Sequence, residues 1–420
     1  MKSGLLTIFF ILLISIPLSA QQNQLTLIDD VYPEEIRLAG FELNAEQGVE
    51  VEAAVLSSRW NYREFSFSYA WILDAHTRQV VWEIDDANLE ERNRPVIIFK
   101  DEISLPPGIY EVYYSTYPYY ENYSHEHGFF SGLFGFLFRD DRQIFYEDDY
   151  ENLYIKVSGS GSELDKDALL NYQEKLRQSA ILSFTSLGDD EEFSKFLNIK
   201  RAVKLRIYAL GEARRNESFD FGWLINTKNR EKVWQLSHRK SVHAGGANKN
   251  RAVDAEIELD TGIYELLYVT DDSHSFRRWN APPPLDPYFW GITVWASSEE
   301  DLQYVNLLQE LPEQQVVVSF DKVRDDEYLA EGFTLTKPLS LHIFALGEGR
   351  DDEMFDYGWI IDSKTRQIVW EMKYEDTENA GGAAKNRLFD DIIRLEPAHV
   401  PNCQNDIVFF ACLKHLSAFL

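Results

Sequence analysis

The fold is decided by the stretch AGGANKNR at residues 244–251, which recurs as AGGAAKNR at residues 380–387. Upstream of it, the stretch ALGE at residues 209–212 recurs unchanged at residues 345–348. Both pairs have the same spacing along the chain, so the two copies align without an insertion. A block repeated over this length is a structural unit, and it predicts a chain built from tandem domains.

Apolar and polar residues alternate within the repeated block. Residues 204–210 read KLRIYAL, and residues 340–346 read SLHIFAL at the matching positions. Alternation rich in branched and aromatic residues is typical of a half-buried strand. The same reasoning predicts further strands at residues 221–225, 232–236, 253–259 and 263–269, with a turn at 226–229. Short strands with frequent turns indicate an all-β protein made of antiparallel β-sandwiches.

A more divergent copy lies upstream of these two. Residues 70–74 and 77–83 read AWILD and TRQVVWE, and they match the hairpin between Trp359 and Glu371. Residues 105–114, LPPGIYEVYY, match the segment at 259–268. We therefore expect three tandem antiparallel β-sandwich repeats, the last one incomplete, joined by short helical connectors.

The repeats divide the chain into predicted segments. Ser162 followed by Asp165 is an N-cap pattern and indicates a helix that runs to about Gln178. The predicted segments are a signal peptide at 1–20, a divergent repeat at 21–160, a helical linker at 161–179, a second repeat at 180–297, a linker at 298–314, a truncated third repeat at 315–397 and a tail at 398–420 that does not resemble the repeats.

The tail departs from the repeat pattern just after Pro397. Both cysteines of the chain, Cys403 and Cys412, lie in it. We expect the third repeat to lack its closing strands, either because the reading frame shifts near Pro397 or because the terminus has diverged naturally. With no cysteine in the remaining sequence, a disulfide scaffold is excluded and the core must come from apolar burial.

The N-terminus predicts export. Lys2 precedes an apolar run at residues 5–16, and the small residue Ala20 comes before a polar segment. This pattern is typical of a signal peptide, here cleaved after Ala20, and indicates a periplasmic or secreted protein. The apolar run is too short for a transmembrane helix, and no longer one follows.

The net charge of −29 restricts the partners. Nucleic-acid binding relies on clustered Lys and Arg, so a nucleic acid is not expected as a partner. An acidic surface would tolerate Ca²⁺, but a solvated acidic surface accounts for the charge without a metal. No cofactor is therefore expected, and the oligomeric state is not indicated.

A dense polar cluster, TDDSHS, follows the last predicted strand of the second repeat at residues 270–275. Asp271, Asp272 and His274 are residue types that ligate metals, and the flanking serines with His274 suggest a nucleophile. Trp279 lies in the polar loop beyond, where its ring could stack on a sugar or a peptide, and Asn280 follows it. The established motifs of metalloproteases and serine hydrolases are missing, and Asp and Ser also build turns, so a purely structural loop is the alternative.

The second candidate is the repeated Gly-Gly loop. Gly245 and Gly246 allow a tight loop with close backbone approach, and Asn250 lies between the cations Lys249 and Arg251. These cations could meet an anion or the Asp271-Asp272 pair, and the alternative is a structural loop with an internal salt bridge. Because loops normally diverge faster than strands, the retention of this loop in both copies hints at a shared site.

Taken together, these patterns predict an exported, non-enzymatic β-sandwich repeat protein. It would bind a small polar ligand, a glycan, a peptide or a protein partner through its end loops. One alternative is a metal-dependent or Ser/His hydrolase that uses the cluster at residues 270–275. The other is a purely structural module of the cell envelope.

Overall fold

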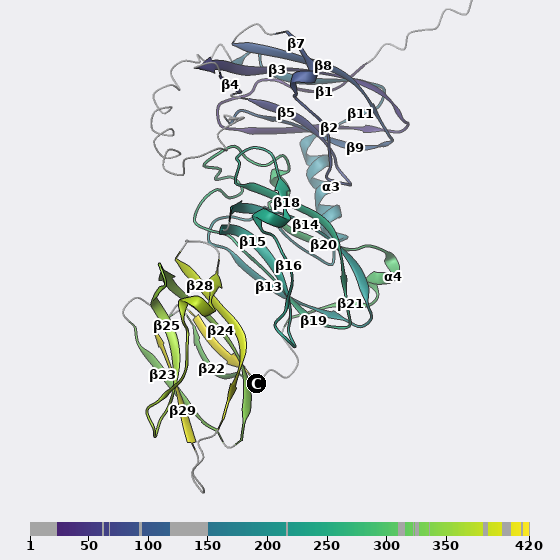
Figure 1. Ribbon diagram of the computed structural model, residues 1–420. Helices are drawn as coiled ribbons and strands as arrows, with labels where there is room; N and C mark the ends of the chain where they lie inside the picture. The colour runs from purple at the N-terminus through teal and green to yellow at the C-terminus, as the bar shows by residue number, and fades with distance from the viewer. Residues whose placement is uncertain are drawn as a thin grey trace, which may run out of the picture.

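The computed structural model describes the chain from Asn23 to Glu396 and the backbone of β29 and β30 near the C-terminus (Figure 1). The residues that it does not describe are 1–22, 61–62, 67, 92–94, 118–149, 216, 310–315, 322, 324–326, 336, 381–384, 397–404, 413–414 and 420. The predicted signal peptide therefore lies outside the described residues.

The prediction of an all-β protein is confirmed. All pairings between the described strands are antiparallel, and the strands gather in three β regions that follow one another along the chain (Figure 1). We call residues 23–164 the first region, residues 182–308 the second region and residues 316–419 the third region. No helix in the described part of the chain has the length and hydropathy needed to span a bilayer.

The first region consists of two sheets. One follows the order β1 (Asn23–Ile28), β10 (Tyr154–Gly159), β3 (Gln47–Trp60), β8 (Val96–Leu105) and β7 (Leu89–Glu91), with β4 (Arg63–Ser66) beside β3. The other follows the order β11 (Ser162–Leu164), β2 (Ile36–Leu43), β9 (Gly108–Ser115), β5 (Tyr69–Asp74) and β6 (Val80–Glu83). Apolar side chains such as Phe41 and Val51 fill the space between them.

The second region is one sheet folded on itself. Its order is β12 (Leu182–Thr185), β20 (Gly291–Ala296), β14 (Val203–Arg214), β15 (Glu217–Asn226), β19 (Gly262–Val269), β13 (Glu192–Ile199) and β21 (Val305–Leu308). Beside this path lie β16 (Lys232–Gln235), β17 (Val242–His243) and β18 (Asn250–Leu259). Trp223 and Trp234 are buried in its core.

The third region has the same strand order, without a counterpart of β21 among its described strands. It reads β22 (Val316–Asp321), β30 (His415–Phe419), β24 (Leu339–Arg350), β25 (Glu353–Asp362), β29 (Asn405–Cys412) and β23 (Leu329–Leu335), with β26 (Ile368–Glu371), β27 (Glu378–Asn379) and β28 (Asn386–Leu395) beside this path. The ladder of β24 and β28 repeats the register of β14 and β18 at the same spacing along the chain that separates the two copies in the sequence.

The tail differs from the sequence-based expectation, because β29 and β30 take the places that β19 and β20 hold in the second region. β29 pairs with β23 and β25, and β30 pairs with β22 and β24. Backbone hydrogen bonding depends little on side-chain identity, so an apolar segment without similarity to the repeat can close a sheet that would otherwise keep unpaired edges. The origin of the tail sequence, by frame shift or by divergence, stays a prediction.

The connectors contain less helix than the sequence suggests. The helix α3 (Lys166–Gln178) begins after Asp165, whose side chain accepts a hydrogen bond from the Ala168 amide at 2.7 Å, and residues from Ser162 form β11 instead. The second connector has one helical turn, α4 (Glu299–Leu302), before β21 pairs with β13. Single 3-10 turns are η1 (Asp86–Asn88), η3 (His238–Lys240), η4 (Pro287–Phe289) and η5 (Tyr374–Asp376).

Candidate functional site

The two predicted loops lie against each other in the second region. The Gly-Gly loop precedes β18, and the other loop joins β19 to β20. Asn250 Nδ2 donates to the carbonyl oxygens of Gly245 at 2.9 Å and Pro282 at 3.0 Å. The Leu285 amide donates in turn to the Ala244 carbonyl at 2.8 Å. The loops therefore form one packed unit at this end of the sheet.

Packing explains why the Gly-Gly loop is retained. Gly245 and Gly246 have φ values of +82° and +64°, which side chains rarely adopt. A Cβ on Gly246 would lie 1.9 Å from the Pro283 carbonyl oxygen, and one on Gly245 would lie 2.2 Å from Leu285 Cγ. The retention that hinted at a shared binding site therefore has a structural cause in the second region.

His274 is fully buried between amide side chains. Its Nε2 lies 2.7 Å from Asn250 Oδ1, and its Nδ1 lies 3.0 Å from Asn280 Oδ1. Burial, with a contribution from Lys249, lowers the pKa of His274 to about 2, so the ring is neutral. Because Asn250 Nδ2 already serves two carbonyls, Asn250 Oδ1 must face the ring and Nε2 carries the proton. Nδ1 is then an acceptor, so the Asn280 atom that faces it at 3.0 Å must be the amide nitrogen, with the oxygen and nitrogen of that side chain exchanged.

Trp279 differs from the sequence-based expectation of a stacking surface. Its side chain is only 8% exposed. Its ring packs edge-on against His274 and Trp290, with centroid distances of 4.9 Å and 5.2 Å. The loop folds back over the sheet, so the apolar ring is buried although its sequence neighbours are polar.

Lys249 and Arg251 point to different places. Lys249 Nζ forms a buried ion pair with Glu212 at 2.7 Å, which matches the alternative of an internal salt bridge. Arg251 Nε donates to Ser241 Oγ at 2.9 Å, on the side of η3. The third region repeats both contacts at the matching positions of its own copy, as Lys385 with Glu348 and Arg387 with Thr377.

The carboxylate of Asp271 also accepts a hydrogen bond from the backbone. Asp271 Oδ1 accepts from the Ser273 amide at 3.0 Å, and the Asp271 amide donates to Asp220 Oδ1 at 2.8 Å. Burial raises the pKa of Asp271, while Asp272 is exposed. No group of three His, Cys, Asp or Glu side chains in the described part of the chain is arranged to hold a metal ion.

The ten candidates thus divide between the interior and the surface. Gly245, Lys249, Asn250, Asp271, His274 and Trp279 are buried, Gly246 and Arg251 are half-buried, and Asp272 and Asn280 are exposed. His274 and Asn250 meet directly. Lys249 and Arg251 are instead bound by Glu212 and by the η3 segment. Together the loops form a closely packed unit rather than an open polar cavity.

This packed unit positions one residue that was not predicted from the sequence as part of a site. Asp286 follows Leu285 in the loop and reaches Arg78, which lies in the turn between β5 and β6 of the first region. Arg78 donates through Nε and Nη2 to Asp286 at 2.9 Å and 2.6 Å. It also donates through Nη1 and Nη2 to Glu111 at 2.6 Å and 2.9 Å, and its side chain is 0% exposed. Paired, charge-assisted contacts of this kind fix both distance and direction.

An apolar contact surrounds this ion pair. Trp71 Nε1 donates to the Leu285 carbonyl at 2.6 Å, and the Trp71 ring stacks on Tyr113 at 5.1 Å. Leu285 and Tyr288 of the second region pack against this cluster, and so does Leu169 from α3. The first and second regions therefore share a small core, and we call this contact the first junction.

The second junction uses the same turn one repeat later. Arg230, between β15 and β16, contacts Glu265 of its own region at 3.5 Å and Asp390 of the third region. His342 Nε2 lies 2.7 Å from the other oxygen of Asp390. Arg78 and Arg230 each stand four residues before a tryptophan of the hairpin, as Arg366 does in the third region. That shared position is the sequence signal that could have revealed the junctions.

Comparison with known proteins does not assign the chain to a class of protein. No family model matches the chain, and no curated protein is similar enough to count as a match.

Proposed function

We propose that this chain is an exported, non-enzymatic β-sandwich repeat protein that acts as an interaction scaffold. Its regions would hold one fixed arrangement and present their outer surfaces to a protein partner. The observation that carries the proposal is the buried contact of Arg78 with both Glu111 and Asp286. Domains that lack a buried contact of this kind usually move relative to one another.

The loop chemistry supports a role in binding rather than catalysis. A Ser/His or metal mechanism needs a nitrogen of His274 directed at a hydroxyl or a metal ion. Both ring nitrogens instead face amide side chains. The end loops are also filled by their own side chains, which favours a partner on the outer surfaces over a small ligand between the loops. Export rests on the N-terminal pattern at residues 1–20.

A distance measurement tests the scaffold. Spin labels would be placed at Glu46 and Glu192, which are exposed in the first and second regions, after Cys403 and Cys412 are replaced by serine. A scaffold gives one narrow distance distribution, and Arg78→Ala should broaden it. A broad distribution in the parent protein would show that the regions move independently, and the proposal would then be wrong.

A further inference from the structure

The third region contains a second copy of the turn that makes the first junction. Residues 74–83 read DAHTRQVVWE, and residues 362–371 read DSKTRQIVWE. Arg78 and Arg366 have φ values of 65° and 60° at the same place in the turn. The pairing of Trp71 with Glu83 recurs as that of Trp359 with Glu371, with the same bulge after the next pair. The two hairpins are therefore built alike.

Their surroundings differ. Arg78 is buried at the first junction, whereas Arg366 is exposed and has no ion-pair partner among the residues that the structure describes. Trp71 is 1% exposed beneath the loop of the second region, but Trp359 is only half-buried. Beside it, Tyr328 is 58% exposed and its ring lies 5.5 Å from that of Trp359. Within the described part of the chain, no further β region is docked on the turn that carries Arg366.

We propose that the hairpin of β25 and β26, with Trp359 and Arg366, binds a loop of a partner protein that presents an apolar residue followed by a carboxylate. The inference rests on the proposed role as an interaction scaffold, and it names the surface and the chemistry of the partner. The first junction supplies the precedent, because Leu285 and Asp286 are such a pair.

The partner must bring the carboxylate because the third region does not provide one at the matching place. At the first junction, Arg78 also pairs with Glu111 of its own region, and Glu111 stands opposite Leu73 in the ladder of β5 and β9. The equivalent pairing in the third region places Val408 opposite Ile361. An exposed arginine without its own carboxylate is suited to a charge-assisted contact with a partner.

A second copy of this chain is a poor fit for the same surface. At each junction the turn lies on a sheet face of the next region, and that face carries an aspartate. The aspartate is Asp254 in β18 or Asp390 in β28, and each stands five residues before the end of its strand. Asp254 accepts from Gln79 at 2.9 Å, and Asp390 accepts from Arg230. The same position in β8 of the first region is Lys100.

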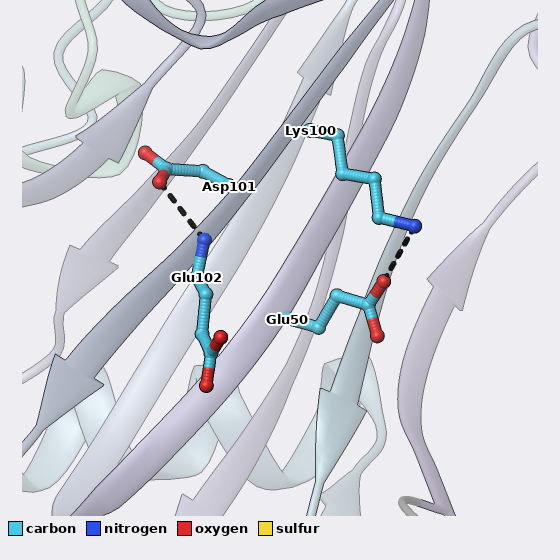
Figure 2. Close-up of a pocket in the computed structure, with 4 residues that line it drawn as sticks. All are labelled: Glu50, Lys100, Asp101 and Glu102. Atoms are coloured by element: carbon cyan, nitrogen blue, oxygen red, sulfur yellow. Dashed lines mark hydrogen bonds and ion pairs between the residues drawn. The ribbon is translucent and has the colours of Figure 1, made fainter.

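The charge order on the first region is therefore reversed. Lys100 Nζ forms an ion pair with Glu50 at 2.7 Å, beside Asp101 and Glu102 (Figure 2). In the second region the corresponding pair is Arg206 with Asp254. Stacking the third hairpin on another copy in the manner of the second junction would set Arg366 against Lys100, at a position that offers no carboxylate for Arg366 to contact. A partner protein other than this chain is the occupant that the charges favour.

A peptide with the sequence of residues 280–290, NAPPPLDPYFW, is the probe for the test. It would be labelled with a fluorophore and titrated with the full chain at low salt. We expect saturable binding, and we expect Arg366→Ala to weaken it about tenfold or more, as the loss of one charge-assisted hydrogen bond does. A peptide with asparagine in place of Asp286 should bind the parent chain equally weakly. Arg394→Ala, which removes an exposed arginine elsewhere in the third region, is the matched control and should have no effect.

Two results would overturn the inference. The first is no saturable binding to the parent chain, or binding that Arg366→Ala leaves unchanged. The second is self-association in sedimentation velocity that Arg366→Ala abolishes, because the occupant would then be a second copy of this chain. Neither result alters the label distances between the first and second regions, so failure of this inference and failure of the scaffold can be told apart.

Discussion

The two junctions join regions of the same design, yet they differ in the number of contacts around the arginine. At the first, the Arg78 side chain has no exposed surface and meets two carboxylates within an apolar cluster that α3 also covers. At the second, Arg230 makes a long contact to Glu265 and one close contact to Asp390. The difference teaches that the same turn can make more or fewer contacts, depending on what the next region supplies around the arginine.

The largest expected effect comes from Arg78→Ala. The substitution leaves Glu111 and Asp286 buried without their cation, and removing one partner of a buried ion pair typically costs about 3–5 kcal/mol. Urea unfolding followed by tryptophan fluorescence should show the loss, together with the broadened label distances. Arg394→Ala controls for the removal of an arginine at the surface. If unfolding by urea is unchanged, the buried ion pair of Arg78 contributes nothing to stability and the contrast between the junctions disappears.

Gly246→Ala should damage the first junction from a distance. A Cβ at this position would lie 1.9 Å from the Pro283 carbonyl oxygen, in the segment that delivers Asp286. Strain from a positive φ and from overpacking suggests a loss of about 2–4 kcal/mol. Gly262→Ala is the control, because the nearest atom there is 3.6 Å away. Unchanged label distances in the Gly246 variant would mean that the loop does not support the junction.

Arg230→Ala should have a smaller effect than Arg78→Ala, about 1–3 kcal/mol, because fewer contacts are lost. The relevant measurement is the distance between labels in the second and third regions, at exposed positions such as Glu192 and Arg394. The distribution should broaden while the distance between the first and second regions stays narrow. An effect as large as that of Arg78→Ala would show that the number of contacts around the arginine does not set the strength of the junction.

Much of the fold could be predicted from the sequence. Alternation located the strands of the second region, and the constant spacing between the two copies carried them to the third. Backbone pairing in the tail could not be predicted by similarity, because β29 and β30 do not resemble the strands whose places they take. Similarity between copies reports side chains, whereas a sheet edge requires only a compatible backbone.

The candidate site was harder to predict. The sequence identified the two loops that meet, but it suggested an open site where the structure has Gly246 against Pro283 and His274 against Asn250. A single glycine pair does not reveal which segment will pack on it. The junctions were missed because Arg78 and Asp286 are 208 positions apart and no local spacing links them. Only the shared position of the arginine in the hairpins could have pointed to them.

Acidification should change the stability of the two junctions in opposite directions. This is the smallest expected effect. Burial raises the pKa of Asp286 despite the attraction of Arg78, so its folded state takes up a proton more readily than the unfolded chain does. Burial also acts to raise the pKa of Asp390, but the contacts with His342 and Arg230 outweigh it and hold this pKa below its usual range. Stability from Asp390 is therefore complete above the pKa of the unfolded chain, about 4, and is lost as the pH falls through the folded value.

Lowering the pH from neutral toward about 4 should then leave the first junction intact or slightly strengthened, and further acidification should loosen the second. Label distances across each junction, measured along the same pH series, check both statements. Asp390→Asn should loosen the second junction at neutral pH and remove its response to acid. If the second junction responds to acid equally in this variant, the response comes from another group, since the variant no longer carries the carboxylate that His342 and Arg230 hold ionised.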